Sequence, residues 1–202
     1  MHKELLSGIA VALTFALFWP YIRSIRRGET KPHVFSWAIW GAGTLIVFFA
    51  QRAGGGGLGA WVIGVSGCIT SYIAVLAYFR RSDLSITRTD WGFLIAALSA
   101  LPFWFLTSEP LWAVVILTVS DLIGFGPTFR TAYHRPYDER MWFYGFSAFR
   151  NLLVVLALHV HSLTTVLFPA VVGFACFILM VVISFRRRAM ASHSIGRKLD
   201  TA

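Results

Sequence analysis

Long apolar runs constrain this chain more than any other feature of its sequence. Only 13% of the residues are charged, about half the usual share in a soluble domain, so little polar surface is available. A helix needs roughly 17–25 apolar residues to cross a hydrocarbon layer about 30 Å thick. Seven runs of 17 to 23 residues meet this requirement: 5–22, 34–51, 58–79, 91–107, 111–129, 141–158 and 163–185. The sequence therefore predicts an all-α membrane protein with seven transmembrane helices.

The basic residues fall almost entirely on one side of such a bundle. Of the 18 Lys and Arg residues, 15 lie in the three alternate loops or in the C-terminal tail, whereas Lys3 and Arg52 lie on the other side and Arg150 lies within a segment. Because cytoplasmic loops retain Lys and Arg, we expect the N-terminus outside and the C-terminus in the cytoplasm. We expect the inner (plasma) membrane of a bacterium as the location. The same placement explains the net charge of +9, so the lipid bilayer is an expected partner and nucleic acid is not.

The two halves of the chain share a spacing of landmarks. A shift of 107 residues places Pro20 on Pro127, each within a Phe-x-Pro-x-apolar-Arg-hydroxyl sequence, and a shift of 106 places Gly67 on Gly173. The spacing predicts two parallel three-helix repeats joined by a linker helix, a 3+1+3 plan with a substrate site expected at the repeat interface. The predicted parts are a first repeat (1–89), the linker helix (90–109), a second repeat (110–188) and a basic cytoplasmic tail (189–202) that we expect to be disordered.

These landmarks resemble those of the PQ-loop/SWEET superfamily of transporters over residues 5–185. Pro20 and Pro127 carry the resemblance, since each lies near the cytoplasmic end of its segment and is followed by a basic loop and an aromatic-rich segment. The glutamine of the Pro-Gln pair is replaced by Tyr21 in one copy and by Thr128 in the other. The plan is also similar to that of vitamin-precursor carriers of the nicotinamide riboside type, whose tryptophan-rich motif is not found in this sequence. The resemblance implies a carrier that works by alternating access, with the two prolines as hinges.

Two ionisable residues lie deep within the predicted segments. Because burying an ionisable side chain in the membrane costs free energy, such residues are candidates for a functional role. Asp121 and Arg150 lie nine and ten residues from the basic ends of their segments, or ~13.5 and ~15 Å at 1.5 Å per residue. Their similar depth predicts that they pair. Such a pair would be either a structural ion bridge or part of a translocation cavity, in which Asp121 accepts a proton or a coupling cation and releases Arg150 to the substrate. The corresponding positions in the first repeat are Thr14 and Gly43, so the repeat does not require the pair.

Helical spacing connects further polar and aromatic side chains to these two. One face of the second segment and the corresponding face of the sixth present aromatic, hydroxyl and amide groups, which suit a small polar ligand. Helix–helix packing with hydrogen-bonded polar groups is the alternative interpretation. In the family that the chain resembles, an aromatic residue and an asparagine at this level contact substrate, which corresponds to Trp40 and Asn151. The candidate substrate-binding residues are Trp37, Trp40, Thr44, Asp121, Tyr144, Ser147, Arg150 and Asn151.

The sequence carries no motif for catalysis or for a cofactor. Cys68 and Cys176 lie within apolar segments, so we expect them to be buried as small hydrophobic residues. The sequence contains no spacing of residues typical of a metal site. We therefore expect a transporter of a small polar metabolite, neither an enzyme nor a metal protein. The alternative is a seven-helix membrane receptor, assembly or scaffold protein without transport. A homo-oligomer is left open.

Overall fold

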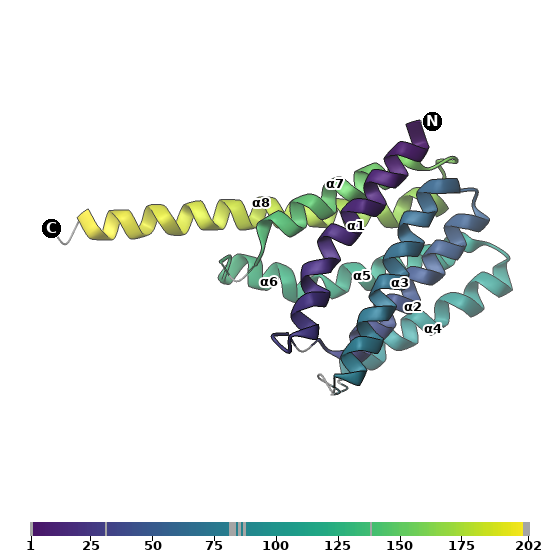
Figure 1. Ribbon diagram of the computed structural model, residues 1–202, viewed down its shortest axis with the longest axis horizontal. Helices are drawn as coiled ribbons and strands as arrows, with labels where there is room; N and C mark the ends of the chain where they lie inside the picture. The colour runs from purple at the N-terminus through teal and green to yellow at the C-terminus, as the bar shows by residue number, and fades with distance from the viewer. Residues whose placement is uncertain are drawn as a thin grey trace.

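The computed structural model describes residues 2–30, 32–80, 84, 86, 88–137 and 139–199, without the side chains of 89, 90, 127 and 191–199. The described chain is helical, and no β-strand is found within it (Figure 1). The helices are α1 (His2–Arg26), α2 (Val34–Ala53), α3 (Gly57–Phe79), α4 (Arg88–Thr107), α5 (Pro110–Gly124), α6 (Gly126–His134), α7 (Met141–Ala157) and α8 (Leu163–Leu199).

All seven predicted segments are helical, and most of their bounds lie within a few residues of the predicted ones. Five helices are long and apolar enough to cross a membrane, namely α1, α2, α3, the α5–α6 pair and α8 as far as Met190. The apolar parts of α4 and α7, Trp91–Thr107 and Met141–Ala157, are shorter. One expectation is wrong: α8 continues to Leu199, so the described backbone of the predicted tail, residues 189–199, is helical where we expected disorder.

The two prolines predicted as hinges lie at different places in their helices. Proline removes one helical hydrogen bond and crowds the carbonyl four residues earlier. Pro20 nevertheless lies inside the uninterrupted α1. At the corresponding place in the second half the helix is interrupted at Phe125, which ends α5 and precedes α6, and Pro127 falls in the first turn of α6. The side chain of Pro127 lies outside the described residues.

The helices pack in the same order in both halves. In the first group (α1–α3), α3 lies between α1 and α2; in the second group (α5–α8), α8 lies between α5 and α7. Across the groups α1 packs against α7, and α2 packs against α5. If α1 corresponds to α5, α2 to α7 and α3 to α8, each packed pair in one half has its counterpart in the other, and the contacts between the halves are also equivalent. The remaining helix, α4, packs against α5 and α2.

The bundle has two ends that differ in charge. The N-terminal end carries the starts of α1, α3, α5 and α8, and the basic end carries the arginine-rich loops at the opposite ends of these helices. Figure 1 shows the basic ends of α1 and α3 at the bottom of the view, whereas α6 and the long α8 run to the left. The two groups therefore diverge towards the basic end.

Glycines allow the second and third helices of each group to approach closely. A Cβ added to Gly67 would lie 2.9 Å from Cδ2 of Leu45, and one added to Gly173 would lie 2.9 Å from Cβ of Asn151. Leu45 and Asn151 are 106 residues apart, as are the two glycines. The same close contact thus recurs at corresponding places in α2–α3 and α7–α8. Small residues at such crossings are typical of helices that associate in membranes, where packing is a main source of stability.

We predict that Gly41→Ala destabilises the fold and that Gly8→Ala does not. A Cβ at Gly41 would lie 2.9 Å from the backbone nitrogen of Ser71, whereas one at Gly8 would meet nothing within 4 Å. Overpacking of this kind costs about 1–3 kcal/mol, while alanine in an open helical position is neutral or slightly stabilising. The measurement is the thermal unfolding midpoint of both variants in detergent. Equal midpoints for the two variants would contradict the close α2–α3 contact.

Candidate functional site

The apolar core is continuous near the N-terminal end and divided near the basic end. One large cluster joins buried side chains of both groups, among them Ala10, Val62, Val114 and Val154. Nearer the basic end each group has a small cluster of its own, and the two do not merge. Their buried residues are Ile25, Ile69 and Ile73 in the first group and Ala132, Leu179 and Ile183 in the second.

A cavity of about 350 Å³ lies between the two groups where the core divides. Its lining reaches from Ile63 and Phe168, near the N-terminal end, to Trp37 and Tyr144 in the first turns of α2 and α7. The cavity therefore extends towards the basic end, and the continuous core closes it on the other side. All eight candidate substrate-binding residues line it: Trp37, Trp40, Thr44, Asp121, Tyr144, Ser147, Arg150 and Asn151.

Side-chain and backbone hydrogen bonds join the two groups at the closed end, where the backbone N–H of His159 donates to the carbonyl oxygen of Gly56 at 3.2 Å. Nζ of Lys3 donates to the carbonyl oxygen of Leu158 at 2.7 Å, and Nε2 of Gln51 donates to that of Thr165, also at 2.7 Å. Gln51 is fully buried, and its Oε1 has no hydrogen-bond partner in the described part of the chain. Because a buried amide is costly unless it is hydrogen-bonded, the bond to Thr165 favours the closed arrangement of this end.

Arg150 links the second group to the first at the floor of the cavity. Its Nε donates to Oγ1 of Thr14 on α1 at 3.0 Å, and Nη2 donates to the carbonyl oxygen of Val62 on α3 at 3.2 Å. Nη1 donates to Oδ1 of Asn151 at 3.3 Å, and the whole residue is 8% exposed. Thr14 occupies the position in the first repeat that Asp121 occupies in the second, so Arg150 contacts the counterpart of its expected partner.

The predicted pairing of Asp121 with Arg150 is wrong. Among the described residues the ion pair found is Arg27–Glu29, at 3.8 Å, and Asp121 forms none with Arg150. The prediction assumed that consecutive segments are neighbours. Instead α7 packs against α1, α3 and α8, and α5 packs against α2, α4 and α8. The guanidinium of Arg150 therefore bonds to α1 and α3 and not to α5.

Asp121 faces the cavity without a partner of its own. Its carboxylate has no hydrogen bond or ion pair in the part of the chain that the structure describes. It also lines a second cavity of about 20 Å³, together with Thr44 and Ser120, which is large enough for a single water molecule. One cavity thus contains a carboxylate and a guanidinium that do not neutralise each other.

An aromatic cluster covers the cavity's first-group wall near the basic end. The rings of Trp37 and Trp40 meet edge to face, 5.7 Å apart, and Tyr21 stacks on Trp37 with ring centroids 5.0 Å apart. Tyr21 follows Pro20, and its ring joins the end of α1 to α2. Sequence reasoning missed this contact, because helical spacing relates residues within a helix and not between α1 and α2.

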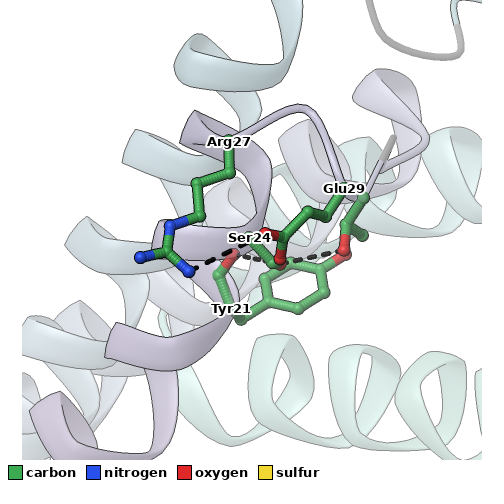
Figure 2. A network of polar contacts seen from close by, with 5 residues as sticks. Tyr21, Ser24, Arg27 and Glu29 are labelled. Carbon is green, nitrogen blue, oxygen red and sulfur yellow. Dashed lines mark hydrogen bonds and ion pairs between the residues drawn. The ribbon is translucent and has the colours of Figure 1, made fainter.

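The turn after α1 holds Tyr21 in place from the backbone side. Figure 2 shows Tyr21 beside Ser24, with Arg27 and Glu29 in the following turn. Oγ of Ser24 donates to the carbonyl oxygen of Tyr21 at 2.8 Å and accepts a hydrogen bond of 2.9 Å from Oγ1 of Thr30. Gly28 supplies the positive φ of 75° that this turn requires.

Other cavity residues were not among the candidates, although the repeat could have indicated several of them. Thr70 and Cys176, 106 residues apart, both line the cavity, as do Ser66 and Val172. The shift of 106 residues is the signal that relates the third segment to the seventh. The other lining residues that were missed are Leu17, Phe18, Ile63, Gly124, Phe125, Thr128, Phe143 and Phe168.

Comparisons of the chain with family models, with curated proteins and with solved structures give no match. The resemblance to PQ-loop and SWEET transporters therefore rests on the prolines, the loops and the repeat spacing of this sequence.

We predict that Thr14→Val lowers stability more than Thr118→Val. Both threonines are buried and donate to the carbonyl four residues earlier, but Thr14 also accepts the hydrogen bond of Arg150. Removing that acceptor leaves one N–H of a buried guanidinium without a partner, which costs about 1–2 kcal/mol. Denaturant unfolding of the two variants measures the difference. If Thr118→Val is equally damaging, the Thr14–Arg150 bond contributes nothing specific.

Proposed function

We propose that this protein is a membrane transporter that moves a small polar metabolite by alternating access. In this proposal seven helices cross the membrane in a 3+1+3 plan related to the PQ-loop/SWEET transporters, with α4 as the linker. The observation that carries the proposal is the cavity between two groups of like packing, closed by a shared core at one end only. A receptor or scaffold has no need for a core that divides between two like halves.

The proposed orientation follows from the charges. The basic end would face the cytoplasm, since Lys and Arg are retained there, and the N-terminal end would face outward. A bacterial inner membrane fits this arrangement. The cavity would then be accessible from the cytoplasm in the state described above.

The proposed cycle exchanges the closed end for the open one. In the outward-facing state the bonds from Lys3 and Gln51 to the second group would break, and the separate clusters of the basic end would close on each other. The three-helix groups would rock about Pro20, which removes one hydrogen bond inside α1, and about Pro127, beside the break between α5 and α6. Arg150 would remain between α1, α3 and α7.

We further propose that Asp121 couples this cycle to protons. An ionised carboxylate without a partner is costly inside the membrane, and proton uptake removes that cost. The release of Arg150 by Asp121 has no part in this mechanism, because Arg150 is bound elsewhere.

We predict that the purified protein in liposomes exchanges one class of small metabolite and that Trp40→Ala impairs the exchange. The assay is counterflow of labelled sugars, amino acids, nucleosides and organic acids into liposomes loaded with the same compound. Loss of the Trp40 ring from the cavity should weaken the apparent affinity roughly tenfold. Trp19→Ala is the matched control, because Trp19 is 58% exposed and does not line the cavity.

Ligand binding without counterflow would contradict transport and would favour a receptor. In the same liposomes an imposed proton gradient should drive accumulation by the wild type and not by Asp121→Asn. Accumulation that is equal with and without the gradient would show that the carrier is not proton-coupled.

A further inference from the structure

The cavity presents two opposite charges that the protein leaves for a ligand. Asp121 and Arg150 line the same space and form no ion pair with each other. A buried charge without a counter-charge is strongly destabilising, whereas a neutralised and hydrogen-bonded one is tolerated. A ligand that neutralises both groups is therefore favoured over one that neutralises a single group.

Arg150 has hydrogen-bonding capacity to spare for an anion. The guanidinium has five N–H groups, and three of them donate to Thr14, Val62 and Asn151. The other two, one on each terminal nitrogen, have no partner among the described residues. None of the three acceptors carries a charge, so the positive charge of Arg150 is held in place but is not neutralised. A ligand carboxylate would supply both the charge and the acceptors.

Asp121 provides the complementary position for a cation. Its carboxylate lacks a described hydrogen-bond donor, and the neighbouring cavity lining includes the Trp40 ring. A ligand ammonium would donate to the carboxylate and pack beside the aromatic face, which favours cations. The rest of the cavity lining consists mainly of rings and aliphatic side chains, among them Trp37, Phe143 and Phe168.

We propose that the cavity binds a zwitterion with an apolar body, its cationic group at Asp121 and its anionic group at Arg150. This inference rests on the proposed function insofar as the cavity is the substrate site. It differs from a sugar site, since a neutral polyol would leave both charges uncompensated.

Three matched probes test the two charges separately on the wild-type protein. L-phenylalanine carries both charges, 3-phenylpropionate lacks the ammonium group and phenethylamine lacks the carboxylate; glucose is the neutral comparison. Isothermal titration calorimetry of the detergent-purified chain measures each Kd. We expect L-phenylalanine to bind roughly 30-fold or more tightly than either singly charged analogue, because each analogue leaves one of the two cavity charges unpaired. Binding of an analogue or of glucose at least as tightly as L-phenylalanine, or binding of none of the four, would overturn the proposal.

Charge-deleting variants then assign each ligand group to its residue. Asp121→Asn should lose the preference for L-phenylalanine over 3-phenylpropionate and keep the preference over phenethylamine. Arg150→Gln should show the reverse pattern, and Arg52→Gln, which lies outside the cavity, should change neither. If Arg150→Gln does not fold, the wild-type series and Asp121→Asn still decide the matter. Unchanged preferences in Asp121→Asn would overturn the assignment of the cationic group.

Counterflow of labelled L-phenylalanine separates this inference from the proposed function. Selective binding of L-phenylalanine without counterflow would support the zwitterion site and contradict transport. Counterflow of glucose or 3-phenylpropionate, without binding of L-phenylalanine, would support transport and overturn the zwitterion site.

Discussion

The guanidinium of Arg150 occupies the point where the continuous core ends and the cavity begins. It connects α7 to Oγ1 of Thr14 and to the carbonyl oxygen of Val62, so the second group is bonded to α1 and α3 of the first. Breaking such an arrangement inside the bundle would leave a buried charge with unfilled donors. The helices are therefore fixed to each other at this level, and beyond it towards the basic end they diverge. That one constraint both closes the floor of the cavity and keeps Arg150 away from Asp121.

The packing of the two halves is alike, but their chemistry is not. Corresponding helices make corresponding contacts, down to Gly67 on Leu45 and Gly173 on Asn151. The charges break this likeness, since Thr14 stands where the second half has Asp121. In the proposed function, the like packing of the two halves would supply two bodies that move against each other, and the unlike cavity residues would give the ligand site a direction. Because one fold can serve many functions, the like packing of the two halves does not by itself identify a ligand site.

The helices and part of the cavity lining could be predicted from the sequence, for a physical reason. Long apolar runs leave few alternatives to membrane helices, and the 3.6-residue period shows which side chains share a face. Neither signal says which helix a face meets. The pairing of Asp121 with Arg150 was predicted wrongly for this reason, because α5 and α7 are consecutive spans without being packed neighbours. The interruption at Phe125 and the stack of Tyr21 on Trp37 likewise depend on contacts between helices, which one sequence does not specify.

The measurement that tests the account most directly is the sidedness of the cavity. On a background of Cys68→Ser and Cys176→Ser, Ser147→Cys places a thiol in the cavity, while Arg26→Cys and His161→Cys mark the basic and N-terminal ends. A charged, membrane-impermeant thiol reagent is then applied to right-side-out and inside-out vesicles. The account predicts that Ser147→Cys reacts from the same side as Arg26→Cys and from the side opposite to His161→Cys. Reaction from the His161 side, or from neither side, would contradict a cavity that is closed at the N-terminal end and accessible from the basic end.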